Sequence, residues 1–281
     1  MRRLKILHRT YYGFTGSVLL EPHRLLLRPR EGYDLRIELS KLEISPSATV
    51  RWMRDEFDNS VAIATFTAPT QQLAIVSEVI VQLYDEKPLD FFVADYAVWY
   101  PFTNDADTSA VLRPFMQSPS QVKQTLKPWI ANFWRGESIE TYALLARLCT
   151  GIHEQMEYRA REEPGVQTAS ETLMRGAGSC RDFANLFLDA ARFLGLAARF
   201  VSGYLHAPSA DGRSGSTHAW AEVYLPGAGW KGFDPTLGEV VGDKHIAVAV
   251  ARLPDTVSPV SGSFFGPTGA TLNVGVWVSE L

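Results

Sequence analysis

The sequence contains only two cysteines in 281 residues, Cys149 and Cys180. One possible bridge cannot form the disulfide framework that holds many small secreted domains together. Cys149 lies in the helical pattern ALLARLCTGIHEQM, where we expect a buried and unreactive thiol. Cys180 follows Gly-Ala-Gly-Ser just before a predicted helix, so its thiol is the candidate for chemistry.

Long apolar runs are also missing. No stretch approaches the roughly 20 consecutive apolar residues that a membrane helix needs. The basic start MRRLKILHRT is followed by YYGFTGSVLL, in which glycine and hydroxyl residues interrupt the apolar ones, so we expect a strand there and not a signal peptide. These absences predict a cytoplasmic protein without a membrane partner.

The chain has no large excess of charge of either sign. Its formal net charge is -4, so nothing indicates the basic surface that binds nucleic acids. The 21% of charged residues is ordinary for a folded protein, and the 46% of hydrophobic residues can fill one large core or two smaller ones.

The first 112 residues carry mainly strand patterns. Short apolar runs typical of strands lie at positions 25–28, 35–39 and 61–66. Proline, glycine, aspartate and asparagine separate them, and several short strands with frequent turns predict a β-sandwich-like domain over residues 1–112. The segment 101–119 is rich in Pro, Asp, Thr and Ser and is predicted to be a linker or long loop.

Residues 113–281 read as helices followed by strands. Helices are predicted at 120 to about 134, 139 to about 156 and 182 to about 193, with a short turn at 171–174. Strands are predicted at 198–204, 218–225, 230–234 and 245–252, and a final strand pair near 260–265 and 271–278. Helices followed by an antiparallel sheet predict an α+β second domain.

Cys180 lies at the first turn of a predicted helix. Gly176 and Gly178 permit a tight approach of the chain to that helix. Unpaired N–H groups and the helix dipole at this end favour an anion, the state in which a thiol is nucleophilic, and the same N–H groups can bind an oxyanion. The alternative is a helix-terminal cysteine that only packs.

The segment STHAWAEVYL, which ends at Leu225, has the alternation of a strand. One face is apolar and belongs to the core: Ala219, Ala221, Val223 and Leu225. The other face is polar and aromatic: His218, Trp220, Glu222 and Tyr224. His218 is therefore a candidate base on the wall of a groove, although a histidine on a strand can also be a simple surface residue.

Asp234 ends the next strand pattern, WKGFD, after the turn sequence PGAG. A four-residue loop would turn Asp234 to the wrong face. A three-residue loop pairs Gly229 with Leu225, and in that register Asp234 lies opposite Trp220 and within side-chain reach of His218. We therefore predict a loop of odd length or a bulge. The alternative for Asp234 is an Asx turn at the strand end.

A thiol, an imidazole and a carboxylate that meet can act together: the carboxylate orients the imidazole, and the imidazole takes the thiol proton. The segments that carry them resemble the three signatures of the transglutaminase-like superfamily: Gly178-Ser-Cys-Arg-Asp-Phe-Ala184, Ser216-Thr-His-Ala-Trp-Ala-Glu-Val223 and Gly232-Phe-Asp-Pro-Thr236. Further segments resemble its bacterial members: 23–29, 55–60, 244–248 and 257–262. The resemblance spans nearly the whole chain.

This resemblance implies a papain-like α+β catalytic core behind an N-terminal β region. Carried over by position, it makes Cys180 the nucleophile, His218 the general base and acid, and Asp234 the residue that orients the base. It implies acyl transfer from a protein, peptide or small amide through a thioester, resolved by water or an amine. No metal or organic cofactor is implied for this chemistry.

One position departs from the animal branch of the superfamily, whose members need calcium and cross-link proteins. They usually carry Trp after the nucleophilic Cys, where this chain has Arg181. There is no EF-hand-like loop either, since Asn104–Asp107 is too short and is predicted to be solvated loop. Hydrolysis is therefore favoured over transfer to lysine.

Four further residues are candidates for contact with the substrate: Trp220, Tyr204, Arg181 and Asp182. The alternatives are aromatic packing for the first two and structural ion pairing for the last two. No metal site is predicted, because the remaining histidines show no ligand-like pairing: His8, His23, His153, His206 and His245.

Two other functions compete with catalysis by the whole chain. A transglutaminase-like fold can serve as a non-catalytic binding module, since fold does not fix function. The front β domain can also bind a partner on which the second domain acts.

Overall fold

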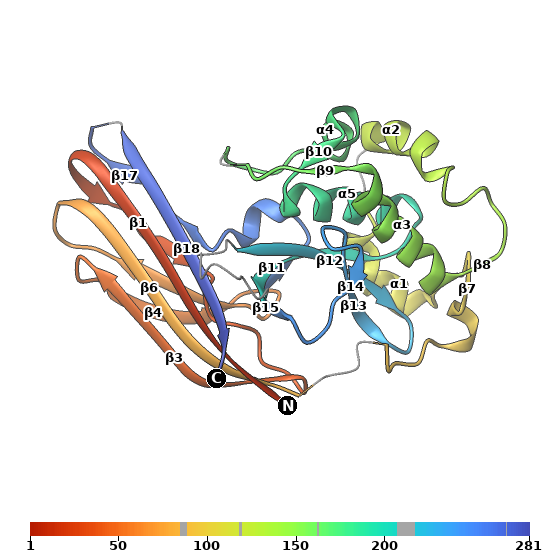
Figure 1. Cartoon of the computed structure of the whole chain (residues 1–281), viewed down its shortest axis with the longest axis horizontal. Coiled ribbons are helices and arrows are strands. Elements are labelled where there is room, and N and C mark those ends of the chain that lie inside the picture. Colours follow the sequence, from red (N-terminus) through yellow and green to blue (C-terminus); the bar gives the residue numbers. More distant parts are fainter. Residues whose placement is uncertain (85–88, 118–119, 162, 207–216, 268) are drawn as a thin grey trace.

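The computed structural model describes residues 1–84, 89–117, 120–161, 163–206, 217–267 and 269–281. The chain forms two lobes: an all-β lobe that holds both termini and a mixed lobe in which helices pack on a sheet (Figure 1). This is the predicted α+β fold. Among the described residues, no helix is both long and apolar enough to cross a membrane.

Two antiparallel sheets make up the β lobe. The larger has the order β18-β1-β6-β3, formed by Ala270–Glu280, Arg2–Leu20, Thr70–Leu83 and Leu35–Ser45, with β17 (Phe264–Phe265) paired to the end of β1. The smaller has the order β16-β2-β5-β4, formed by Val260–Ser261, His23–Leu25, Ser60–Thr65 and Thr49–Arg54. Their apolar side chains, among them Val18, Leu25 and Ile75, share one core. The sandwich-like expectation is confirmed.

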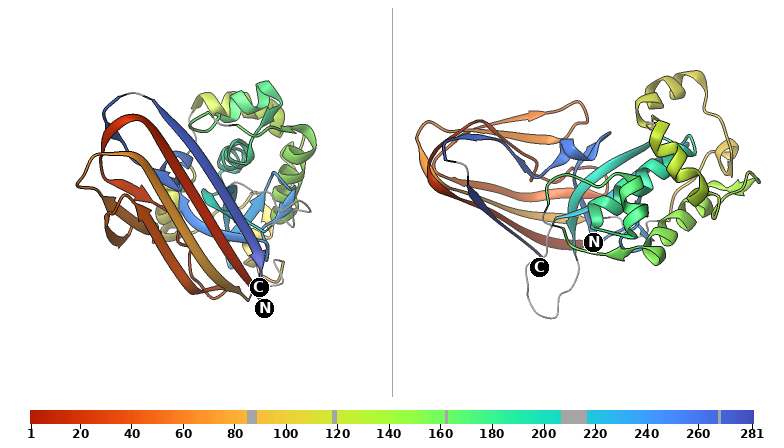
Figure 2. Two further views of the ribbon diagram at one scale, coloured as in Figure 1. Left: turned by 60° about the vertical axis from the view of Figure 1, so that its left-hand side comes forward. Right: turned by 90° about the horizontal axis from the view of Figure 1, so that it is seen from above.

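The C-terminal strands join this lobe. β18 pairs with β1 from Leu4↔Glu280 to Phe14↔Ala270, while β16 pairs with β2. The expected pairing between the last two strand segments is therefore wrong, because each pairs with a strand from the start of the chain. The boundary at residue 112 stays a prediction. In Figures 1 and 2, β18 is the strand of its sheet on the side of the mixed lobe.

The mixed lobe is built on one antiparallel sheet. Its order is β14-β13-β12-β11-β15, formed by Glu239–Val240, Gly229–Asp234, His218–Leu225, Ala198–Leu205 and His245–Ala251. Helix α5 (Cys180–Phe193) packs on β12 and β11 through Phe183, Leu186 and Phe187, which recur every three or four residues. Three helices surround α5: α2 (Ser120–Ile130), α3 (Thr141–Gln155) and α4 (Ala169–Arg175).

The segment 101–119 is not a simple linker. It contains α1 (Ala106–Leu112) and the 3-10 helix η2 (Arg113–Phe115); residues 118–119 lie outside the described part. Asp105 caps α1 by accepting hydrogen bonds from the Thr108 N–H (2.8 Å) and hydroxyl (2.7 Å). The acidic segment expected to be solvated loop is thus a helix start. The remaining short elements are η1 (Asp95–Ala97), β7 (Trp99–Tyr100), β8 (Ile139–Glu140), β9 (Glu157–Tyr158), β10 (Ala177–Gly178) and η3 (Pro254–Val257).

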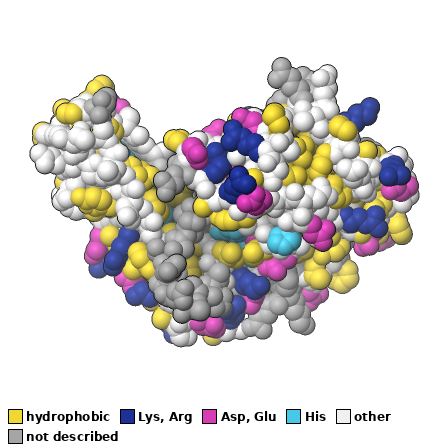
Figure 3. All heavy atoms as spheres, turned by 45° about the horizontal axis from the view of Figure 1, so that its top comes forward, with side chains coloured by type: hydrophobic (Ala, Val, Ile, Leu, Met, Phe, Trp, Pro, Cys, Tyr) yellow, Lys and Arg dark blue, Asp and Glu magenta, His cyan; other side chains and the backbone are white. Residues whose placement is uncertain are grey.

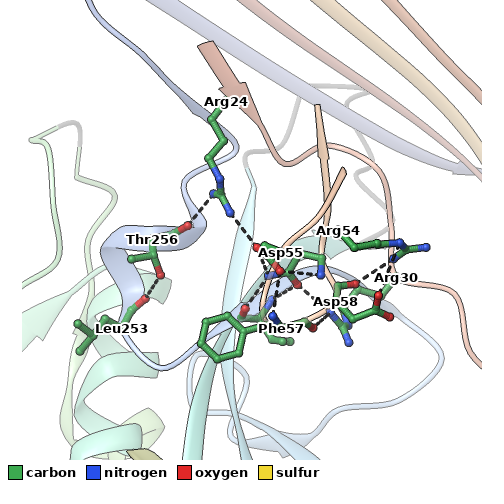
Figure 4. A network of polar contacts seen from close by, with 10 residues as sticks. Arg24, Arg30, Arg54, Asp55, Phe57, Asp58, Leu253 and Thr256 are labelled. Atoms are coloured by element: carbon green, nitrogen blue, oxygen red, sulfur yellow. Dashed lines mark hydrogen bonds and ion pairs between the residues drawn. The ribbon is translucent and has the colours of Figure 1, made fainter. Parts of the chain in front are cut away.

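A buried polar contact fixes one lobe to the other. The side chain of Asn59 donates to Val250 C=O (2.8 Å) and accepts from Val250 N–H (2.9 Å), so the β lobe completes the backbone hydrogen bonding of β15. Arg24 reaches between Asp55 and the carbonyl of Thr256 (Figure 4). Asn59 is fully buried, so its two hydrogen bonds to Val250 are shielded from water. They hold β15 against the N-terminal lobe.

Candidate active site

Cys180 is the first residue of α5, two residues before the predicted start. The Asp182 carboxylate reaches back to the N–H and hydroxyl of Ser179 (both 2.8 Å), which lets the helix begin earlier. Position 178 must be small, because a Cβ there would lie 2.8 Å from Asp182 Cβ. The side chain of Cys180 is partly exposed, and its Sγ lies 4.0 Å from Thr217 C=O. The thiol is therefore accessible at the positive end of a helix.

The hairpin that brings Asp234 to His218 has the predicted register. Leu225 pairs with Gly229, which leaves a three-residue loop, and Gly229 adopts φ 76°. His218 Nε2 donates to Asp234 Oδ2 over 2.6 Å. The odd-length loop and its consequence, a contact between the two side chains, are confirmed.

Asp234 is held as a carboxylate by four donors. Oδ2 accepts from His218 and from His245 (3.0 Å), and Oδ1 accepts from the N–H groups of Thr236 (2.9 Å) and Leu237 (3.3 Å). Burial raises the pKa of Asp234, but the hydrogen bonds from the two histidines outweigh it and keep this pKa well below its ordinary value. The side chain is fully buried, so its charge acts on these partners rather than on water.

The imidazole of His218 lies between this carboxylate and the thiol. Its Nε2 faces Asp234, so Nδ1 is the nitrogen available to Cys180. Burial lowers the pKa of His218, but the hydrogen bonds with Asp234 and Cys180 outweigh it and raise the pKa to about 10. His218 is therefore a stronger base than an ordinary histidine, as a general base beside a thiol requires.

Cys180 and His218 open into a cleft of about 640 Å³ between the lobes, where Figure 3 shows the surface hollowed. One wall belongs to the mixed lobe and includes Tyr158, Arg161 and Arg181. The facing wall includes Leu272 and Val274 of β18. Both β18 side chains lie on the inward face of the sheet, opposite Tyr12 and Thr10, yet they are 58% and 41% exposed.

Profiles of two related families match the chain. The transglutaminase-like superfamily profile matches residues 129–235, and the bacterial transglutaminase-like N-terminal region matches residues 4–82. The chain belongs to the transglutaminase-like superfamily.

Similar proteins extend this match over the chain. An uncharacterized protein of Mycobacterium tuberculosis is 27% identical over 277 residues, which cover 94% of this chain and 88% of the relative. One of Mycobacterium leprae is 25% identical over 291 residues and covers both chains fully. The crystal structure of a proposed cysteine protease from Cytophaga hutchinsonii superposes with a TM-score of 0.74 at 19% identity, covering 100% of this chain and 91% of that one. This last likeness shows a shared fold.

Three of the four expected substrate contacts lie outside the cleft of this transglutaminase-like core. Trp220 is 1% exposed, because Phe57 of the β lobe packs on that face of the sheet. Tyr204 is 2% exposed, with its hydroxyl bonded to His8 Nδ1 (3.1 Å). Asp182 is buried in an ion pair with Arg161 (2.9 Å), so its role is structural.

Arg181 does line the cleft, and its contact with substrate stays a prediction. Its guanidinium donates to the main-chain carbonyls of Arg161 (3.3 Å) and Glu163, while its buried Nε has no partner within the described parts of the chain. It thus keeps a positive charge beside Cys180 without an ion pair to a described acid.

His245 contacts Asp234, which sequence analysis missed. His218, Asp234 and His245 each offer one ligand atom, and these atoms lie within 4.8 Å of one another, a spacing compatible with a metal ion. Both histidines face Asp234 Oδ2 through Nε2. A metal would need a lone pair on both Nε2 atoms. Gly242 N–H donates to His245 Nδ1 (3.3 Å), which assigns the proton of that ring to Nε2. The donors as arranged suit hydrogen bonding to the carboxylate.

Proposed function

We propose that this protein is a cysteine-dependent acyl-transfer enzyme that acts on amide bonds. Cys180 is the nucleophile, His218 the general base and acid, and Asp234 the residue that orients and charges the imidazole. The observation that carries the proposal is the line of contacts from a partly exposed thiol through His218 to a buried carboxylate, at the mouth of a cleft. Membership of the transglutaminase-like superfamily supports it.

The chemistry follows from this geometry. The thiolate attacks the carbonyl carbon, and the oxygen that gains the electron pair is stabilised by N–H groups at the start of α5. The C–N bond then breaks, and His218 Nδ1 gives its proton to the leaving amine. Water attacks the thioester, passes a proton to His218 and releases the acid with regeneration of the thiolate. We favour water over an amine as the acceptor.

The cleft supports a polypeptide substrate over a small amide. Its volume of about 640 Å³ exceeds what a single amino-acid side chain fills, and it extends from Cys180 to β18. Leu272 and Val274 offer exposed apolar side chains on the wall that faces the thiol. Among the described strands, β18 pairs only with β1. The other edge of β18 is therefore available for hydrogen bonds to an extended peptide.

Selective alkylation tests the proposal. Iodoacetamide should modify Cys180 far faster than Cys149, which is buried and whose pKa is raised by burial. His218→Gln should slow modification of Cys180 at least tenfold, and Cys180→Ser should abolish turnover of a fluorogenic peptide library. Turnover that survives Cys180→Ser would contradict catalysis by Cys180. Equal labelling of the two cysteines would contradict it too, and would favour a non-catalytic binding module.

A further inference from the structure

His245 lies outside both segments that match the family profiles, residues 4–82 and 129–235. It is the first residue of β15, and its side chain is only 1% exposed. β14 and β15 lie at opposite edges of the sheet. The segment that connects them crosses the sheet and brings the His245 imidazole to Asp234. Nothing in the matched motifs gives this histidine a role.

The hydrogen bonds of His245 define its donor. A main-chain N–H can only donate, so the bond from Gly242 N–H makes His245 Nδ1 an acceptor. The ring proton is then on Nε2, which donates to Asp234 Oδ2 over 3.0 Å. This is the same oxygen that accepts from His218 over 2.6 Å. Two imidazoles therefore share one carboxylate oxygen.

We propose that His245 is a positioning residue of this site, acting on Cys180 and His218 through Asp234. It fixes the orientation of the carboxylate and takes part of the negative charge on Oδ2, which moderates the basicity of His218. The inference rests on the proposed function for its catalytic meaning, but the coupling between the two histidines does not depend on any substrate.

The surroundings of His245 keep its ring in place. Trp220 packs edge-on against it, with ring centroids 5.2 Å apart at 76°, and Asn59 anchors β15 from the other lobe. The titratable groups that face this carboxylate and its partners are Cys180 from α5, His218 from β12 and Cys149 from α3. A fixed donor against a fully buried carboxylate holds Asp234 in the one orientation that serves His218.

Two substitutions separate donation from packing. His245→Gln keeps an N–H donor where Nε2 now lies, whereas His245→Leu keeps bulk and loses the donor. His245→Leu should lower kcat/KM by about 10- to 100-fold, the size expected when a buried charge loses a hydrogen bond. It should also raise the pKa of His218. The carboxylate of Asp234 then accepts a hydrogen bond from one imidazole instead of two, so it stabilises the protonated form of that ring more strongly. His245→Gln should stay within about threefold of wild type and leave that pKa unchanged.

The matched control is His8→Leu, which removes another 1%-exposed histidine whose side-chain partners are Tyr204 and Thr10. It should lower the unfolding temperature without moving the pKa of His218. That pKa is read by NMR titration of histidine-labelled protein, without turnover, so the coupling is tested even if no peptide is cleaved. An unmoved pKa in His245→Leu, or equal losses in the Leu and Gln variants, would overturn the positioning role.

Discussion

Replacing Asp234 by Asn tests how the carboxylate sets the state of the imidazole. The carboxylate accepts four hydrogen bonds, from His218, His245, Thr236 and Leu237. An amide offers one acceptor oxygen and one NH₂ group. If the oxygen keeps the two main-chain N–H groups, the NH₂ faces the histidines, and His218 must carry its proton on Nδ1. That nitrogen then cannot accept the proton of the thiol.

The size of the effect follows from the pKa of His218. Asp234 helps to raise this pKa to about 10, so at pH 7 the imidazole holds a proton that Cys180 can supply. Alkylation of Cys180 at pH 7 should therefore fall at least tenfold, because the thiolate is the nucleophile and the imidazole no longer accepts its proton. Turnover should fall more, on the order of 10³- to 10⁴-fold, because the wrong tautomer also fails to protonate the leaving amine.

The assay is the rate of carboxamidomethylation of Cys180 against pH, followed by intact mass in a Cys149→Ala background. Asp189→Asn is the matched control, since Asp189 is also a buried carboxylate, on α5, and burial raises its pKa to about 6. It should leave the rate within about twofold of wild type. If Asp234→Asn reacted at the wild-type rate with an unchanged pH profile, the carboxylate would not control the thiol and the reasoning would fail.

Other substitutions test the rest of the site. Asn59→Ala leaves the N–H and C=O of Val250 without partners and should lower the free energy of unfolding by about 2 to 4 kcal/mol, measured with urea. Leu272→Asp should raise KM for peptides at least tenfold with little change in kcat, whereas Asn273→Asp on the opposite face of β18 should change neither. Folded His218 keeps its proton up to about pH 10, against an ordinary pKa of 6.5. Its contribution to stability should therefore be complete below pH 6.5 and vanish as pH rises to about 10, which the difference between wild type and His218→Gln in guanidinium unfolding measures.

Local patterns were sufficient to predict the contact between His218 and Asp234. Alternation along a strand fixes which face His218 occupies, and a two-residue period leaves only an odd loop that turns Asp234 to the same face. The helix after Cys180 follows from its apolar spacing. Each of these features depends on neighbours within about 20 residues, where sequence and geometry are tightly linked.

The features that sequence analysis missed depend on distant parts of the chain or on how the chain crosses the sheet. Trp220 is on the predicted face of its strand, but Phe57, more than 150 residues earlier, covers it. His245 has the local pattern of an ordinary strand start, and only the crossing of the sheet brings it to Asp234. The pairing of β18 with β1 joins the two ends of the chain, which no local periodicity can reveal.

Trapping the acyl-enzyme tests the central claim most directly. Protein with Cys149→Ala is mixed with a peptide-amide library, quenched in acid within the first turnover and measured by intact mass. The account predicts an acyl adduct on Cys180 that hydroxylamine removes and that Cys180→Ser does not form. Cleaved peptide with no adduct on Cys180 would contradict it.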